Sequence, residues 1–184
     1  MAALALFVTS VCGGVGGASA AHPAGHSLMP SPPGSGASVR FLGGGRMTFG
    51  AIVLTLNQDA KEIRILNVRL VKAKRVTMIG ARVAGPHRPV YQFVEVRGFP
   101  GHYNRKSVPA RGAVITPHNR GWGLLVGLRV KRGPRAVMQG VRISYRTVGH
   151  HQIKQQTLYS ELVVCTRKSD LDGHRTCVPP ARSR

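Results

Sequence analysis

Residues 122–147 alternate apolar and polar side chains with a period of two, and this alternation restricts the fold more than any other feature. In 122–130 (WGLLVGLRV) one face is apolar and the other is small or basic, with only Leu125 out of phase. Residues 141–146 (VRISYR) repeat the pattern. Successive side chains of a β-strand point to opposite faces, so both runs are predicted as half-buried strands, with Trp122 in the core. The Gly133-Pro134 pair between them predicts a β-hairpin.

Similar runs recur along the chain, separated by Gly, Pro and Asn turn signals, and no window keeps a 3.6-residue apolar period. Almost no helix is therefore expected. Between Ile63 and Val71 the apolar phase changes, which predicts a β-bulge near Leu66. The spacing predicts a single antiparallel β-sandwich, with a β-barrel as the alternative. The other expected strands are 49–56, 63–71, 76–83, 90–96, 112–116, 151–157 and 159–166.

The first 21 residues have the layout of a secretory signal peptide. An apolar run, MAALALFVTSV, is followed by small residues and by the cleavage pattern Ala18-Ser19-Ala20. No Lys or Arg precedes the run, so either the true start lies upstream or the export signal is weak. A buried N-terminal strand is the alternative. A lipid anchor on Cys12 is not expected, because Val11 stands where a small residue is required.

Composition divides the rest of the chain into three parts. Residues 22–46 are rich in Pro, Gly, Ser and Ala and are predicted to be a flexible tether. Residues 47–179 are assigned to the β-sandwich domain and 180–184 to a basic tail. No transmembrane span is expected after removal of the leader, because the apolar run is short.

The chain is strongly cationic, with 27 Lys and Arg against 6 Asp and Glu and a formal charge of +21. Such an excess bears on partners and solubility rather than on fold. An Arg-rich composition is also what GC-rich codons supply, so a merely compositional charge is the alternative. Aromatic residues make up 5% of the chain, which disfavours recognition of nucleic acid by base stacking.

Basic residues follow the polar phase of the two alternating runs. Arg129 and Lys131 belong to the first arm, and Arg142 and Arg146 to the second. If the arms pair as a hairpin, the four side chains share one face and form a candidate anion-binding site. The partners expected for an exported protein are anionic cell-envelope polymers or lipid headgroups. A nucleic-acid-binding protein is the alternative that the charge allows and the leader opposes.

Cys165 and Cys177 are the two cysteines that remain after removal of the leader. An exported location favours their oxidation to a disulfide, and the Asp172-Gly173 turn between them brings the two ends together. Closing this loop stabilises the fold by about 3 kcal/mol in the chain-entropy model. Metal binding by both cysteines with His174 is the alternative, although their spacing is not a zinc pattern.

No catalytic motif and no cofactor are predicted. The sequence contains no G-x-S-x-G, no H-E-x-x-H and no spaced pair of carboxylates, and Glu95 and Glu161 are isolated. Few carboxylates leave few general bases, so the chain is predicted not to be an enzyme. The alternative is a copper-binding protein: cleavage after Ala21 would expose the amino group and imidazole of His22, with His26 nearby.

The strand pattern resembles the immunoglobulin-like β-sandwich domains of small exported proteins from GC-rich, Gram-positive actinobacteria. The runs IRILNVRLV and VTMIGARV and the later blocks LLVGLRV, GVRISYR and ELVVC carry the resemblance, which covers residues 47–166. Most such proteins are uncharacterised; with the leader and the lack of a catalytic motif, the leading expectation is a secreted or envelope-associated interaction or structural protein without catalytic activity. The chain departs from true immunoglobulin domains in having no Cys between Cys12 and Cys165, so their inter-sheet disulfide has no counterpart.

Overall fold

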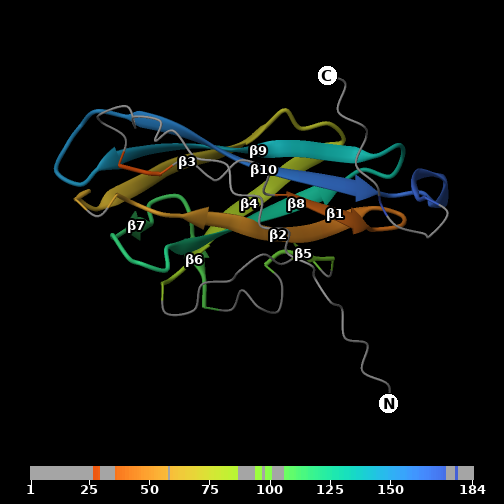
Figure 1. The fold of residues 1–184 in the computed structure, drawn as a ribbon, viewed down its shortest axis with the longest axis horizontal. Helices are drawn as coiled ribbons and strands as arrows, with labels where there is room; N and C mark the ends of the chain where they lie inside the picture. Colours follow the sequence, from red (N-terminus) through yellow and green to blue (C-terminus); the bar gives the residue numbers. More distant parts are fainter. Residues whose placement is uncertain are drawn as a thin grey trace, which may run out of the picture.

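Two β-sheets pack face to face in a computed structural model (Figure 1). The structure describes residues 27–29, 36–57, 59–86, 94–96, 98–100, 106–172 and 177. One sheet, here the β9 sheet, has the order β1 (Gly36–Arg40), β10 (Lys154–Cys165), β9 (Ala136–Thr147), β3 (Ile63–Val71), β7 (Val114–Ile115). The other, here the β8 sheet, has the order β5 (Val94–Glu95), β2 (Gly45–Leu54), β8 (Trp122–Val130), β4 (Val76–Ala84), β6 (Val108–Pro109).

The order of the long strands is that of an immunoglobulin sandwich. The neighbours β2, β8 and β4 correspond to strands B, E and D, and β10, β9 and β3 to strands G, F and C. All pairs are antiparallel except that of β1 with β10. The predicted β-sandwich is therefore confirmed. No α-helix occurs among the described residues, which contain one 3₁₀ turn at Lys168–Asp170.

The predicted hairpin of residues 122–147 is wrong. Its two arms are the strands β8 and β9, which lie in different sheets, and residues 131–135 cross from one sheet to the other. The alternation correctly indicates that each strand buries one face, but it does not identify the hydrogen-bonded neighbour. At this corner the buried Thr166 hydroxyl donates to the carbonyl of Gly133 (2.6 Å) and accepts from its amide (2.9 Å). The φ of Gly133, +144°, favours glycine.

The predicted tether at 22–46 is also wrong over much of its length. Residues 36–40 form β1, and β2 begins at Gly45. Leu28 is fully buried in the core and pairs with Leu56 in an isolated bridge, which the Met29 amide extends by donating to the Thr55 carbonyl (2.8 Å). The predicted leader at 1–21, the copper-site candidates His22 and His26, and the basic tail at 180–184 lie outside the described residues.

Register irregularities explain where the strand predictions fit and where they do not. The register of β3 against β9 shifts between Ile65 and Asn67, which confirms the predicted bulge at Leu66. Residues 154–165 form one strand, β10, with a shift between Tyr159 and Leu162, where two strands were predicted. Within β10 the core-facing residues Leu158, Leu162 and Val164 keep one phase on both sides of this shift, so the predicted boundary between residues 157 and 159 has no structural counterpart.

The core lies between the two sheets and is built from the apolar phase of each long strand. Leu124 and Val126 of β8 meet Val141 and Ile143 of β9 in one cluster. Trp122 packs against this cluster, as predicted, and its indole nitrogen donates to the carbonyl of Thr116 (2.9 Å). Holding the indole N–H in this way lets the ring be largely buried at one end of the sandwich.

Tyr145 is the largest fully buried side chain. Its hydroxyl makes no hydrogen bond of normal geometry within the described residues. Burial raises its pKa above the usual 10.0, and the backbone of Leu28 and Ser27 offsets part of that rise. The folded protein therefore holds this proton more tightly than the unfolded chain, so the contribution to stability is complete below pH 10.0 and is lost as the pH rises through the folded pKa.

Replacing Tyr145 with Phe should remove this alkaline dependence. Because the hydroxyl is buried and makes no hydrogen bond of normal geometry among the described residues, we expect Tyr145→Phe to be as stable as the native protein at neutral pH, or more stable by up to about 1 kcal/mol. Above pH 10 the advantage of the variant should grow. Urea unfolding at pH 7, 10 and 11 measures it, and a constant difference across the three values would contradict the assignment.

The outer face of the β8 sheet is covered near its centre by the segment 98–100. The Thr48 hydroxyl donates to the carbonyl of Gly98 (2.7 Å). The Phe99 ring lies over Gly127, and the Phe99–Pro100 peptide bond is cis. A Cβ on Gly127 would come within 2.3 Å of that ring, so glycine makes room for the cover. Leu125 is fully buried but lies outside the main core cluster, because its phase faces this covered side.

Candidate anion-binding face

The outer face of the β9 sheet carries two pairs of arginines on neighbouring strands. Arg64 of β3 is opposite Arg146 of β9, and Arg69 of β3 is opposite Arg142 of β9. Arg69 and Arg142 are exposed, and Arg64 and Arg146 are half-buried. Residues directly opposite in antiparallel strands have Cα atoms about 5 Å apart, so each pair brings two guanidinium groups within reach of one anion.

The strand phase and the β3 bulge place these four side chains together. In β9 the core-facing residues are Val141, Ile143 and Tyr145, which leaves Arg142 and Arg146 on the outer face. In β3 a regular strand would put residues 64 and 69 on opposite faces. The extra residue at the bulge restores the phase, so that both arginines point away from the core.

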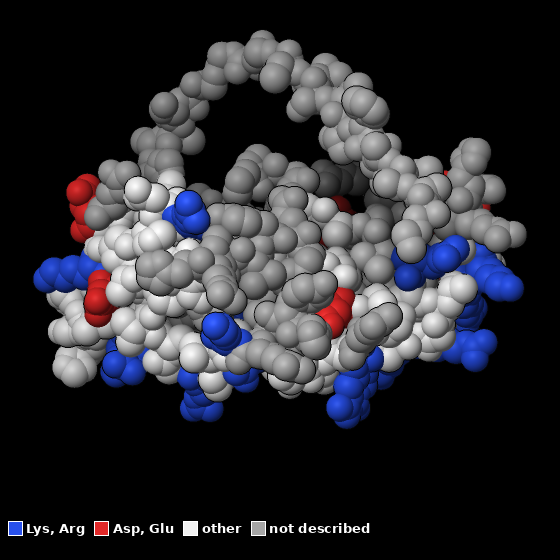
Figure 2. Space-filling view, turned by 90° about the horizontal axis from the view of Figure 1, so that it is seen from below, with Lys and Arg blue, Asp and Glu red and all other residues white. Residues whose placement is uncertain are grey.

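No ion pair neutralises these four arginines among the described residues, and the nearest carboxylate along β3 is that of Glu62, two residues before Arg64. Among the described residues, the one hydrogen bond or ion pair of these four side chains is from Arg64 Nη1 to the carbonyl of Gly112 (3.3 Å). Like charges directly opposite each other in a sheet are destabilising, so a bound anion would relieve repulsion as well as gain hydrogen bonds. Figure 2 views the molecule from below, the side on which β5 and β6 lie in Figure 1, and there too basic side chains project along the margins with few acidic ones among them.

The structure divides the predicted four-residue site between two sheets. Arg142 and Arg146 lie on the outer face of the β9 sheet, as predicted. Arg129, however, belongs to the β8 sheet, where it is opposite Arg46, and Lys131 follows β8 with its amide bound to the carbonyl of Arg75 (3.0 Å). The prediction that Arg129, Lys131, Arg142 and Arg146 share a face is wrong, because it depended on the hairpin.

Arg64 and Arg69 were not among the residues predicted from the sequence. Their signal was present, because the predicted bulge at Leu66 implies that residues 64 and 69 share a face. Which strand lies beside β3 could not be read from the sequence, and so the two arginines were not connected with β9. The candidate face therefore consists of Arg64, Arg69, Arg142 and Arg146.

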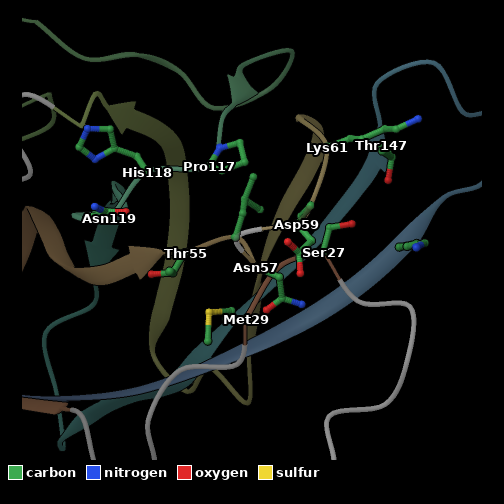
Figure 3. Close-up of a pocket in the computed structure, with 13 residues that line it drawn as sticks. Ser27, Met29, Thr55, Asn57, Asp59, Lys61, Pro117, His118, Asn119 and Thr147 are labelled. Atoms are coloured by element: carbon green, nitrogen blue, oxygen red, sulfur yellow. The ribbon is translucent and has the colours of Figure 1, made fainter.

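A hollow of about 1170 Å³ lies at one end of the sandwich. Figure 3 shows that Ser27 and Met29, the loop after β2, Pro117 to Asn119 and Thr147 surround it. Its charged lining is mixed, with Asp59 beside Lys61 and Lys154. His118 accepts a hydrogen bond from the backbone amide of Arg120 through Nδ1 (3.2 Å). A single carboxylate and a histidine held by its own loop form no catalytic arrangement, so the arginine face remains the better candidate.

The predicted disulfide between Cys165 and Cys177 is present, with the two Cα atoms 5.6 Å apart. It covers the outer side of the β9 sheet near the end of β10, where Val163, Val137 and Leu171 pack around it. Both cysteines are thereby occupied, and the metal alternative for them no longer applies. Gly173 of the predicted turn and His174 lie outside the described residues.

Three further observations bear on function. Within the part of the chain that the structure describes, no three His, Cys, Asp or Glu side chains are grouped so that they could hold a metal ion. In that same part, no helix is sufficiently long and apolar to cross a membrane. The chain matches no protein-family model and no curated protein. The assignment of function therefore depends on the geometry of the arginine face.

Proposed function

We propose that this protein is an exported, non-catalytic interaction module of the cell envelope, which contacts anionic polymers through Arg64, Arg69, Arg142 and Arg146. The observation that carries the proposal is that two arginine pairs lie across neighbouring strands on one outer sheet face. None of the four arginines forms an ion pair with a carboxylate among the described residues. Several weak contacts of this kind act together by releasing counterions from a polyanion.

Export is supported by two independent features. The apolar run at the start of the sequence ends in the Ala18-Ser19-Ala20 pattern. The Cys165–Cys177 disulfide is typical of oxidising compartments and rare in the reducing cytosol. Envelope polymers are the polyanions that an exported protein meets first, and the outer face of the β9 sheet presents its arginine pairs in rows along which a linear polymer can lie.

The proposal predicts salt-dependent binding that depends on position and not only on net charge. We expect the oxidised protein to bind purified Gram-positive cell wall with an affinity that falls about 50-fold between 50 and 200 mM salt, as four phosphate contacts to a single strand imply. Changing all four arginines to Gln should abolish most of this dependence. Sedimentation of wall-bound protein across the salt series measures it.

A matched control removes the same charge from elsewhere. Arg46, Arg129, Lys131 and Arg132 are exposed and belong to or follow strands of the β8 sheet, and Arg129 and Lys131 are the two residues that the sequence wrongly placed on the face of Arg142 and Arg146. Changing these four residues to Gln should leave binding within about twofold of the native protein, because they are not on the β9 sheet. Equal loss in both variants would show that the charge acts only through its total, and the proposed site would be rejected.

A further inference from the structure

The arginine pairs belong to a series of cross-strand rows on the outer face of the β9 sheet. The first row is Arg64 and Arg146, and the third is Arg69, Arg142 and Thr157. Between them lies an uncharged polar row of Asn67, Ser144 and Gln155. Adjacent rows on one face are two residues apart, or about 7 Å, which separates the two cationic rows by about 13 Å.

The middle row presents uncharged hydrogen-bonding groups, and one of them, Asn67, is oriented by the backbone. The Asn67 side-chain oxygen accepts the backbone amide of Val68 (2.9 Å), so its NH₂ group is left as the outward-facing donor. Asn67 and Gln155 are exposed and Ser144 is half-buried. Amide NH₂ groups and a hydroxyl in this position can hydrogen-bond both the hydroxyl groups and the phosphodiester oxygens of a ligand segment.

From this alternation we infer that the face is a two-point site for a linear polyol phosphate. Two phosphodiesters that are two repeat units apart occupy the arginine rows, and the phosphodiester between them, with its flanking hydroxylated units, lies over Asn67, Ser144 and Gln155. The two non-bridging oxygens of each phosphodiester face the two guanidinium groups of one row. This inference rests on the proposed function and specifies the chemical class of its polymer.

The side chains around the rows favour this class over a membrane or a nucleic acid. Among the described residues, the exposed large apolar side chains are Leu42, Val96, Val108, Val148, Ile153 and Tyr159, and only Tyr159 belongs to β3, β9 or β10. Val148 and Ile153 lie beside the first row, just outside β9 and β10, whereas the second and third rows carry no apolar side chain of the kind that enters lipid. Tyr159 is one row beyond Arg142, and one aromatic ring cannot stack a series of bases.

The test is a chain-length series of glycerol phosphate oligomers with two, three and five phosphates, titrated into the oxidised protein by calorimetry. An extended unit is about as long as one row spacing, so two phosphates reach only one arginine row and three reach both. Two linked contacts gain from effective concentration. We expect the affinity to rise at least about tenfold between two and three phosphates, and by much less between three and five.

Two variants and one control show which arginines produce the rise in affinity between two and three phosphates. Both R64Q/R146Q and R69Q/R142Q should abolish it, because each removes one of the two contact points. R46Q/R129Q removes an equivalent cross-strand pair from the β8 sheet and should retain it. A smooth rise with phosphate number, or an equal loss in the control, would overturn the two-point site, although binding to cell wall through these arginines could still stand.

Two further ligands distinguish the polymer class. Single-stranded DNA of the same phosphate number should bind more weakly than the glycerol phosphate oligomer, because its bases find no stacking platform. Vesicles of phosphatidylglycerol should bind without a difference between R64Q/R146Q and R46Q/R129Q. Tighter binding of DNA would assign the rows to nucleic acid, and a vesicle affinity lost only in R64Q/R146Q would assign them to lipid headgroups. Either result overturns the inference.

Discussion

Changing Leu28 to Ala should destabilise the protein by about 2–5 kcal/mol, although Leu28 belongs to a segment with the composition of a linker. Its side chain is fully buried in the main core cluster, which also contains Tyr145. The backbone of Leu28 lies beside the Tyr145 hydroxyl. Truncation to Ala removes buried methyl groups and leaves a cavity between the ends of the two sheets. Urea unfolding followed by tryptophan fluorescence measures the loss, because Trp122 is the only Trp in the chain.

Leu42 provides the matched control. It has the same side chain and lies in the turn between β1 and β2, but 44% of its surface is exposed. Leu42→Ala should therefore change the free energy of unfolding by no more than about 0.5 kcal/mol. If Leu28→Ala had an effect as small as that of Leu42→Ala, residues 27–29 would not be part of the folded core in solution.

Leu28 also shows a limit of composition as a guide to structure. Pro, Gly and Ser around it indicate a flexible segment, and a single apolar residue has no period. Its burial depends on the gap at the open end of the sandwich, which exists only after β2 and β9 have packed. The same holds for β1, whose pairing with β10 is parallel and joins residues far apart in the chain. Such contacts are fixed by tertiary structure and have no local signal.

The long strands, in contrast, were predictable because each has an internal pattern. The bounds of β3 and of β8 match the predicted runs 63–71 and 122–130, and the bulge at Leu66 followed from the phase change alone. The disulfide followed from the number of cysteines and from the short loop between Cys165 and Cys177. These inferences required only neighbours in sequence, which is why they held.

Two of the four residues of the candidate site, Arg142 and Arg146, were predictable because they too belong to a strand with an internal pattern. The alternation gave the outward phase of Arg142 and Arg146 but not their neighbours across the sheet. A sandwich corner and a hairpin have the same period-two signature, and the segment 131–135 contains a Gly-Pro pair that suits either. What distinguishes the two is a hydrogen bond from a residue 33 positions away, Thr166, to Gly133.

The corner between β8 and β9 should therefore depend on that one hydroxyl. We expect Thr166→Val, which keeps the shape of the side chain, to cost about 2–4 kcal/mol, because it leaves both the amide and the carbonyl of Gly133 without their partner in a buried position. Thr166→Ser keeps the hydroxyl and should cost less than about 1 kcal/mol. Urea unfolding compares the two variants.

Amide hydrogen exchange makes the test specific to the corner. The Gly133 amide donates to the Thr166 hydroxyl (2.9 Å), so its exchange should accelerate in Thr166→Val relative to amides in the centre of β9. In Thr166→Ser its protection should remain native. Since the corner fixes how β9 follows β8, loosening it should also weaken the register that places Arg142 and Arg146 beside β3. Equal stability of the Val and Ser variants, with unchanged exchange at Gly133, would mean that packing alone holds the corner.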